Sequence, residues 1–240
     1  WKFCWYESID SRSKDFFNPS YDDAAWDEMP VPGMWELNGY GDPVYKNIGY
    51  AWHGHYKDNP PYPAMEHNYA GQYRKTFTID GQWKGKDVYL YIGSATSNVR
   101  VWINGKEVGY SEDSKLEARF NITRYVKQGE NHVALEIFRW CDGTYLEDQD
   151  FWRLTGISRD VYVYSREKNR IEDVLVKASA SGEAVISAEV SKGVSKVSFE
   201  LKDPYGKSVF SEIVSVNKKV CSQRGFPVVE FTAKVPSVLQ

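Results

Sequence analysis

The sequence predicts an all-β protein, with a jelly-roll β-sandwich over residues 1–166 followed by an immunoglobulin-like β-sandwich over residues 167–240. Short segments of alternating apolar and polar residues, separated by Gly, Asn, Asp and Pro, are typical of antiparallel sheets. Aromatic content divides the chain, because all nine Trp fall between Trp1 and Trp152. The formal net charge also changes, from −5 over residues 1–166 to +2 over residues 167–240. Together these observations indicate two β modules.

The strand pattern of the first module centres on a hairpin. Residues 88–92 and 99–103 are predicted strands, and Asn104-Gly105 supplies the positive-φ pair of a two-residue turn before a strand at 106–110. Many short strands within this length favour a jelly roll. Further strands are expected at residues 72–79, 118–121, 132–139 and 158–164.

Residues 17–69 differ from the rest of the first module, since they hold seven prolines and few strand patterns. A long irregular segment inside a compact domain is usually either disordered or functional. The density of Trp, Tyr and Phe in this segment argues against disorder. We therefore expect an ordered, shaped loop region.

The second module shows simpler alternation, with a turn at 203–206 of sequence Asp-Pro-Tyr-Gly. Four or five strands in about 70 residues are typical of an immunoglobulin-like sandwich. We expect the chain to stop before the last strand of this module, which would leave a sheet edge exposed. The predicted strands are residues 171–178, 183–190, 196–202 and 228–235.

Composition excludes several classes of function. A formal net charge of −3 gives no indication of nucleic acid or of an anionic membrane as a partner. No apolar run approaches the roughly 18 residues of a membrane helix. Cys4, Cys141 and Cys221 lack the spacing of a disulfide framework or a zinc site, so buried free thiols are expected. The chain opens at Trp1 without a leader and is expected to be a piece of a longer protein, whose compartment is left open.

The densest polar and aromatic cluster spans residues 140–153. Carboxylates and amides bond sugar hydroxyls, while indole rings cover the apolar C–H face of a sugar, so this mixture is typical of carbohydrate binding. The alternative is a solvated acidic loop anchored in the core by Phe151 and Trp152. Glu147 and Asp150 are a poor catalytic pair, because residues three apart in an extended loop tend to point to different sides.

A second cluster spans residues 31–47, where glycines and prolines fix a loop that offers Trp35, Tyr40 and Tyr45 as stacking faces. The alternative for this cluster is aromatic packing beneath a long loop. Met34 and Leu37 are expected in the core under either interpretation.

At these two clusters the chain resembles glycoside hydrolase family 2, in its branch of large bacterial β-galactosidases. The resemblance covers residues 1–165 well and the remainder mainly by strand pattern. Its most specific part is the run Tyr-Leu-Glu-Asp-Gln-Asp-x-Trp-Arg at residues 145–153. Other matching positions are Trp1-Lys2-Phe3, Trp35, Asn38-Gly39-Tyr40, Trp102-Ile103-Asn104-Gly105, Asp113-Ser114 and Arg159-Asp160-Val161.

The resemblance implies that a (β/α)8 barrel bearing both catalytic glutamates follows these two modules, so none of the 240 residues is expected to be catalytic. It also implies that Asp150 contacts the galactose 6-hydroxyl and a sodium ion, completed by the barrel, and that a magnesium site lies on the barrel. Trp152 is a further candidate for sugar contact.

One position departs from the family pattern. Many relatives carry Asn or Asp before Ser-Ala, ahead of the strand that contains Trp102, and an ungapped reading places Thr96 there, followed by Ser97 and Asn98. Thr96 and Asn98 are therefore weaker candidates for sugar binding, because the threonine side chain is shorter.

The leading hypothesis is that this chain is the non-catalytic N-terminal part of a retaining β-galactosidase that acts on terminal β-D-galactosides, inactive by itself. Its expected partners are β-galactosides and the barrel of its own protein, in a homo-oligomer. Two alternatives stay open: a stand-alone carbohydrate-binding module, and a structural or interface domain without sugar contact.

Overall fold

A computed structural model describes residues 1–50, 52–54, 57, 59–147 and 150–234. The chain divides into two compact units, Trp1–Ser165 and Arg166–Gln240. Strands dominate both units, with only three short 3-10 helices among the described residues, so the predicted all-β fold class is confirmed. No helix in the described part of the chain is long and apolar enough to cross a membrane.

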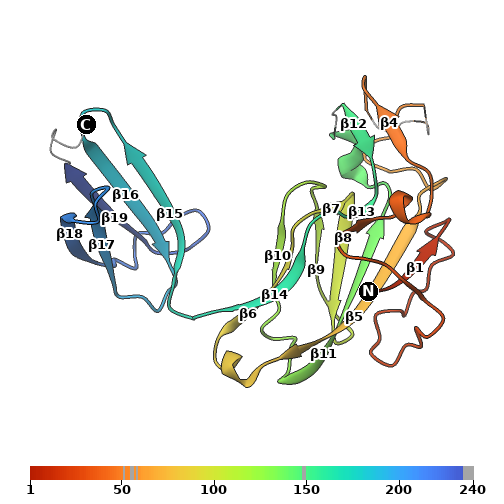
Figure 1. Cartoon of the computed structure of the whole chain (residues 1–240), viewed down its shortest axis with the longest axis horizontal. Helices are drawn as coiled ribbons and strands as arrows, with labels where there is room; N and C mark the ends of the chain where they lie inside the picture. Colours follow the sequence, from red (N-terminus) through yellow and green to blue (C-terminus); the bar gives the residue numbers. More distant parts are fainter. Residues whose placement is uncertain (51, 55–56, 58, 148–149, 235–240) are drawn as a thin grey trace. The chain divides into compact units, whose positions relative to one another are not determined.

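The first unit is a β-sandwich (Figure 1). One sheet has six strands in the order β2-β1-β5-β11-β8-β9, and the other has three in the order β10-β6-β14. Their bounds are β1 Lys2–Tyr6, β2 Asp27–Glu28, β5 Ala70–Ile79, β6 Asp87–Ile92, β8 Asn98–Ile103, β9 Lys106–Glu112, β10 Ala118–Asn121, β11 Gly129–Phe138 and β14 Val161–Arg166.

Small strands and short helices complete the first unit. Two further sheets pair β12 with β4, and β13 with both β3 and β7. The bounds are β3 Gly33–Met34, β4 Val44–Lys46, β7 Ala95–Thr96, β12 Phe151–Arg153 and β13 Gly156–Ile157, with 3-10 helices η1 Glu36–Asn38, η2 Gly81–Trp83 and η3 Asp142–Tyr145.

The core of the first unit lies between its two main sheets. Val88, Leu90 and Ile92 of β6 are buried, while the residues between them are half-buried, as period-two alternation requires. They pack in one cluster with Val101 of β8 and Leu135 of β11. Sheet-on-sheet burial of these aliphatic side chains is the main stabilising contribution in a sandwich of this kind.

The predicted hairpin between residues 99 and 110 is confirmed. Ile103 pairs with Lys106 across the two-residue turn, and Asn104 and Gly105 have φ of 51° and 80°. This turn type needs positive φ at both positions, which Asn and Gly tolerate best. The Asn104 side chain also accepts a hydrogen bond from His132 N at 2.9 Å, which ties the turn to β11.

The irregular region between residues 17 and 69 is ordered over its described residues by aromatic packing. Phe17 stacks on Trp102 with ring centroids 5.3 Å apart, and Phe16 contacts the same indole edge-on. Trp35 is fully buried, its indole N–H donating to the Tyr73 hydroxyl. Leu37, predicted for the core, is instead 74% exposed, because it lies in η1, a short 3-10 helix that buries none of its residues.

The second unit consists of a three-stranded sheet, β15-β16-β19, and a two-stranded sheet, β17-β18. Val190, Phe199 and Phe231 lie in its core. The predicted turn at 203–206 is present, with Gly206 N donating to Asp203 O at 2.9 Å. The bounds are β15 Ile171–Ala178, β16 Glu183–Val190, β17 Lys196–Lys202, β18 Ser208–Ser215 and β19 Val228–Lys234.

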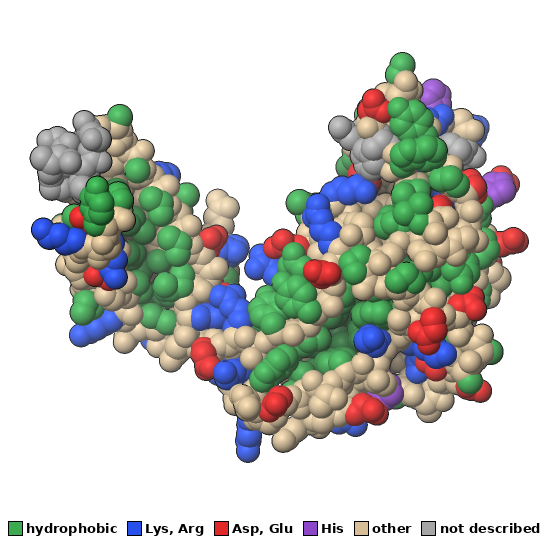
Figure 2. Space-filling view, in the orientation of Figure 1, with side chains coloured by type: hydrophobic (Ala, Val, Ile, Leu, Met, Phe, Trp, Pro, Cys, Tyr) green, Lys and Arg blue, Asp and Glu red, His purple; other side chains and the backbone are tan. Residues whose placement is uncertain are grey.

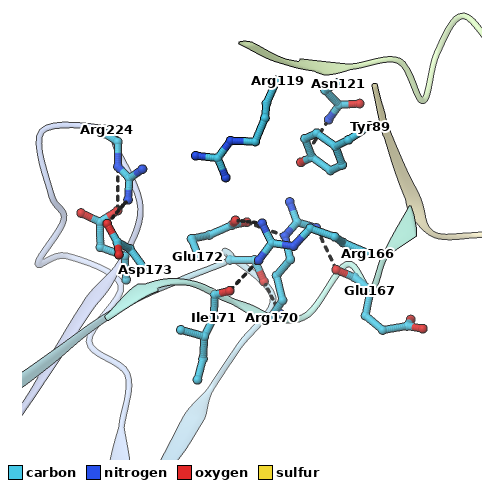
Figure 3. Close-up of polar contacts among 12 residues, drawn as sticks. Tyr89, Arg119, Asn121, Arg166, Glu167, Arg170, Ile171, Glu172, Asp173 and Arg224 are labelled. Carbon is cyan, nitrogen blue, oxygen red and sulfur yellow. Dashed lines mark hydrogen bonds and ion pairs between the residues drawn. The ribbon is translucent and has the colours of Figure 1, made fainter. Parts of the chain in front are cut away.

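Arginine–carboxylate contacts fix the start of the second unit (Figure 3). Arg166 and Arg170 both contact the buried carboxylate of Glu172, at 2.9 and 2.7 Å. Arg224 lies 3.0 Å from Asp173. The three cysteines are free thiols as predicted, but the expectation that all are buried is wrong, since Cys221 is exposed beside a surface turn.

A substitution at Gly71 on β5 tests the close packing at the centre of the first unit. A Cβ at this position would lie 2.2 Å from Trp35 Cζ2 and 2.9 Å from Phe3 Cε2. We expect Gly71→Ala to lower the free energy of unfolding by roughly 1–3 kcal/mol through overpacking. Urea unfolding followed by Trp fluorescence measures this unit alone, because every Trp lies within it.

Gly81→Ala is the matched control, since a Cβ there meets only the flexible end of Gln128, at 3.0 Å. Equal stability of the Gly71→Ala and Gly81→Ala variants would contradict the close packing of Trp35 on β5.

Candidate functional site

The candidate site is a two-stranded ribbon formed by β4 and β12 at one end of the first unit (Figure 1). The pairing places Trp152 opposite Tyr45, and their ring centroids lie 5.4 Å apart. Asp150 immediately precedes β12, is exposed, and accepts a hydrogen bond of 2.9 Å from the Tyr45 hydroxyl. This bond and the negative charge of Asp150 raise the pKa of Tyr45, so the phenol stays a neutral donor.

An exposed carboxylate therefore stands beside two aromatic rings that are each about half exposed, at 50% for Tyr45 and 54% for Trp152. Such a group accepts hydrogen bonds from hydroxyls or contacts a hard cation, while the rings offer apolar faces. Asp148 and Gln149, which belong to the same predicted cluster, lie outside the described residues.

One anchor fixes the loop that precedes Asp150. The Glu147 carboxylate accepts hydrogen bonds from the backbone N–H and the hydroxyl of Ser114, at 3.2 and 2.7 Å. Arg153 donates to the backbone oxygen of Glu147 at 3.3 Å. Glu147 thus holds the loop against the segment after β9, and its carboxylate is already committed to Ser114.

A second anchor fixes the chain that follows β12. Thr155 N donates to both carboxylate oxygens of Glu36, at 2.8 and 3.1 Å, and Trp35 N donates to Thr155 O at 2.8 Å. Burial raises the pKa of Glu36 from its ordinary value of 4.5, although the Thr155 N–H partly opposes that shift. The exit from the site is therefore clamped to the fully buried Trp35.

A third anchor fixes the segment that precedes β4. Arg139, at the end of β11, donates to the backbone oxygen of Asp42 at 2.9 Å, just before β4. Arg139 as a whole is 5% exposed, and its guanidinium lies over the rings of Tyr69 and Trp140, 4.7 and 5.0 Å from their centroids. Cation–π contacts of this kind are strongest where the cation is desolvated.

Thr96 belongs to β7, which pairs with β13 and not with the ribbon. Its hydroxyl donates to Ser114 O at 3.3 Å and lies 3.5 Å from Lys115 Nζ, whose pKa is lowered by burial. The adjoining cavity measures about 20 Å³, room for about one water molecule rather than a sugar.

Asn98, the other weak candidate, is 1% exposed and bonds inside the sandwich. Its amide donates to Phe138 O at 3.3 Å and its oxygen accepts from Phe138 N at 3.3 Å. These bonds give Asn98 a structural role. Contact of Thr96 or Asn98 with a sugar stays a prediction, and the positions of their side chains do not support it.

Exposed apolar side chains surround the ribbon. Figure 2 shows hydrophobic side chains gathered at the end of the first unit that carries β4 and β12. Among the described residues of 44–67 and 142–152, the large exposed apolar side chains are Tyr45, Ile48, Tyr50, Tyr62, Met65, Leu146 and Trp152, of which Leu146 is 85% exposed. Contiguous exposed apolar surface rimmed by polar groups is typical of interaction sites.

A separate cluster contains potential metal ligands. Among the described residues, Glu112, Cys141 and Asp142 bring their ligand atoms within 4.8 Å of one another. Burial, followed by the nearby Asp142, raises the pKa of Glu112, and the Tyr110 hydroxyl donates to its carboxylate.

A family model described as "Glycosyl hydrolases family 2, sugar binding domain" matches residues 1–167. The chain belongs to this family. A β-galactosidase of Priestia megaterium is 40% identical over 235 residues, which cover 93% of this chain and 23% of that protein. A β-galactosidase of Streptococcus thermophilus is 38% identical over 177 residues, covering 74% and 17%. The family resemblance inferred from the motifs is thereby confirmed.

Two solved structures share the fold of this family 2 chain. A β-glycosidase from Bacteroides vulgatus superposes with a TM-score of 0.62 at 22% identity, covering 96% of this chain and 28% of that one. A β-glucuronidase from Bifidobacterium dentium gives 0.67 at 15% identity, covering 98% and 40%. The chain spans about a fifth of the length of the curated relatives it matches.

Ser114 and Glu147 lie in sequence runs that match the family, but the sequence does not indicate that they bond to each other, nor that Glu36 bonds to Thr155. Period-two patterns carry no signal for bonds between positions 33 and 119 residues apart. For Ser114 and Glu147, the one feature of the sequence that could have indicated a role was their position inside runs that match the family.

The raised pKa of Glu36 gives a testable pH dependence. The folded chain holds this proton more tightly than the unfolded chain, so the stabilisation is present at low pH and lost as the pH rises through the raised pKa. Glu36→Gln keeps an acceptor for Thr155 but cannot ionise. We expect the variant to gain stability relative to wild type as the pH rises above 4.5, the ordinary pKa of the carboxyl group. Urea unfolding followed by Trp fluorescence at a series of pH values measures the difference.

Glu7→Gln, at an exposed position of the same unit, controls for removal of a carboxylate in general. A pH-independent difference between Glu36→Gln and wild type would contradict the role assigned to burial of Glu36.

Proposed function

We propose that this chain is the non-catalytic N-terminal part of a retaining β-galactosidase, and that its β4–β12 ribbon forms one wall of the galactoside pocket. The observation that carries the proposal is the exposed Asp150 carboxylate beside Tyr45 and Trp152, on a ribbon anchored at both ends. The names of the curated relatives supply the reaction class, the hydrolysis of terminal β-D-galactosides.

The chemistry of the ribbon suits one side of a sugar. The Asp150 carboxylate accepts a hydrogen bond from a primary hydroxyl, and the exposed ring faces of Tyr45 and Trp152 cover apolar C–H groups. A retaining glycosidase also needs two carboxylates, one acid and one nucleophile. Because Glu147 is bonded to Ser114, Asp150 is the one uncommitted carboxylate among the described residues of the ribbon, and the catalytic pair is assigned to another domain.

Asp150 also fits a role as a sodium ligand. Its carboxylate and the adjacent Tyr45 hydroxyl are hard oxygen donors, the type that alkali and alkaline-earth cations prefer. Two donors leave the coordination incomplete, so the remaining ligands are assigned to the catalytic barrel, where a magnesium ion is also expected. Bound sodium would supply positive charge beside the sugar hydroxyl.

The exposed apolar residues around the ribbon support docking of a further domain. Ile48 and Leu146 are 83% and 85% exposed, and burial against a partner would remove both from water. We assign that partner to the (β/α)8 barrel of the same protein. A stand-alone sugar-binding module or a purely structural domain would use the same ribbon differently, and substitution of Asp150 separates these functions.

Asp150→Ala in the full-length enzyme tests the proposal. A hydrogen bond to a charged group contributes about 1.5–3 kcal/mol, so kcat/KM for a nitrophenyl β-galactoside should fall by roughly 10- to 100-fold. The response of the rate to added sodium should weaken in the same variant. Steady-state rates at several sodium concentrations, for wild type and variant, measure both effects.

Glu130→Ala provides the control, since its side chain is 70% exposed at the start of β11, away from the ribbon. Wild-type kcat/KM and sodium response in Asp150→Ala would exclude the pocket role and leave the ribbon as an interface.

A further inference from the structure

The first strand of the second unit exposes apolar side chains on both of its faces. β15 is the outermost strand of the sheet β15-β16-β19, and Val174, Leu175 and Val176 are 51%, 54% and 57% exposed. Successive residues of a strand point to opposite faces of the sheet. Both faces of β15 therefore carry apolar side chains in contact with water, and the pairing of β15 with β16 identifies the face that belongs to the core.

Three apolar residues of β15 point to the core side of the sheet. Val174 pairs with Ala188 of β16, and Ile171 pairs with Val190. Residues directly opposite each other in an antiparallel pair point to the same face. Ala188 and Val190 are buried in the core of this unit, so Val174 and Ile171 point to the core side, as does Val176 two positions after Val174. We call Ile171, Val174 and Val176 the core-face row.

The opposing sheet is too narrow to cover the core-face row. It consists of β17 and β18, whose Phe199 and Phe210 pack on Phe231 of β19 with ring centroids 5.2 and 4.8 Å apart. β18 lies against β19, and Figure 1 shows both β17 and β18 on the β19 side of the unit. The two strands therefore cover the core residues of β19 and β16, whereas the core-face row on β15 stays about half exposed.

β17 offers a free hydrogen-bonding edge on the side of the unit where β15 lies. Among the described residues β17 pairs with β18 alone, so the backbone groups on its other edge have no strand partner there. Because β18 lies against β19, the free edge of β17 faces the β15 side of the unit. A strand edge of this kind is a template for pairing with another strand. A strand bound at this edge would lie over β15 and cover the core-face row.

The residues of β17 indicate which kind of strand fits beside it. Val197 and Phe199 are buried, whereas Lys196, Ser198 and Glu200 alternate with them and are exposed. A partner strand therefore needs apolar side chains on the core side and polar side chains on the other, the period-two pattern of a half-buried strand. Addition of a strand at the outer edge of β15 fits worse, because it would leave the core-face row exposed.

We propose that a strand with this pattern, from the part of the same protein outside these 240 residues, pairs with β17 and packs on the core-face row. The inference rests on the proposed function, in which the chain is one part of a longer enzyme; the matched residues cover 23% of the Priestia megaterium relative. The added strand widens the β17–β18 sheet to three strands and buries Ile171, Val174 and Val176. The second unit then depends on the rest of the protein for part of its core.

Hydrogen exchange followed by mass spectrometry, on the 240-residue chain and on the full-length enzyme, tests the pairing. Amides of residues 196–202 at the free edge of β17 should exchange at least about tenfold more slowly in the full-length enzyme, because strand pairing closes that edge. Residues 208–215 of β18 are the matched control, and their exchange should differ by less than about threefold. Equal exchange of residues 196–202 in the two proteins would overturn the proposal. Protection of β17 that grows with the concentration of the 240-residue chain would also overturn it, in favour of a second copy.

Two neighbouring substitutions test the packing. Val176→Asp places a charge in the core-face row, and Leu175→Asp places the same charge on the opposite face of β15 at similar exposure. In the full-length enzyme, Val176→Asp should raise the rate of proteolysis within residues 166–240 at least about tenfold, because a buried unpaired charge destabilises the unit. Leu175→Asp should change that rate by less than about threefold. Equal rates for the two variants would contradict burial of the core-face row.

These measurements separate failure of this inference from failure of the proposed function. Exchange and proteolysis require no catalysis, whereas the role of Asp150 is measured by the rate of galactoside hydrolysis. An unprotected β17 together with a large loss of kcat/KM in Asp150→Ala would overturn the strand alone and leave the ribbon in the pocket. A protected β17 together with wild-type kinetics in Asp150→Ala would support the strand and exclude the pocket role of the ribbon.

Discussion

The close packing of Trp35 on β5 is the constraint on which the candidate site depends. Its indole occupies the space that a side chain at Gly71 would need, and its N–H groups bond Tyr73 and Thr155. The next residue, Glu36, accepts from the backbone of Thr155. The fully buried Trp35 and its neighbour therefore fix the position of the chain segment that follows β12, and with it the position of the exposed ribbon.

From that fixed point the ribbon is built by pairing at a distance in sequence. β4 and β12 lie more than 100 residues apart, and their register brings Tyr45 to Trp152 and to the carboxylate of Asp150. Arg139 holds the start of β4 through Asp42, and Glu147 holds the loop before β12 through Ser114. The anchoring side chains bond to other groups of the protein, whereas Asp150 is exposed and has one described protein partner, Tyr45. An exposed carboxylate with a single partner can form further hydrogen bonds to a ligand.

Local patterns predicted most of the large strands. An almost wholly apolar run located β6, alternation located β8, and the Asn104-Gly105 pair located the hairpin, because all three signals depend on neighbouring residues. The short strands β3, β4, β7 and β13 had no such signal, since their pairing is set by partners far along the chain.

The site was predicted in part and by a different route. Resemblance to the family singled out Asp150, whereas composition alone left an acidic loop as an alternative. The burial of Asn98 depends on Phe138, 40 residues away, and the commitment of Glu147 depends on Ser114. The exposure of Cys221 and Leu37 likewise could not be predicted from composition, which favours burial of a thiol and of a leucine.

A crystal structure of the full-length enzyme with galactose, and with rubidium replacing sodium, tests the central claim most directly. The ribbon should border the sugar, with an Asp150 carboxylate oxygen about 3 Å from the primary hydroxyl or from the cation. Galactose seated in the catalytic domain while Asp150 contacts neither sugar nor cation would contradict the claim that this chain forms a wall of the pocket.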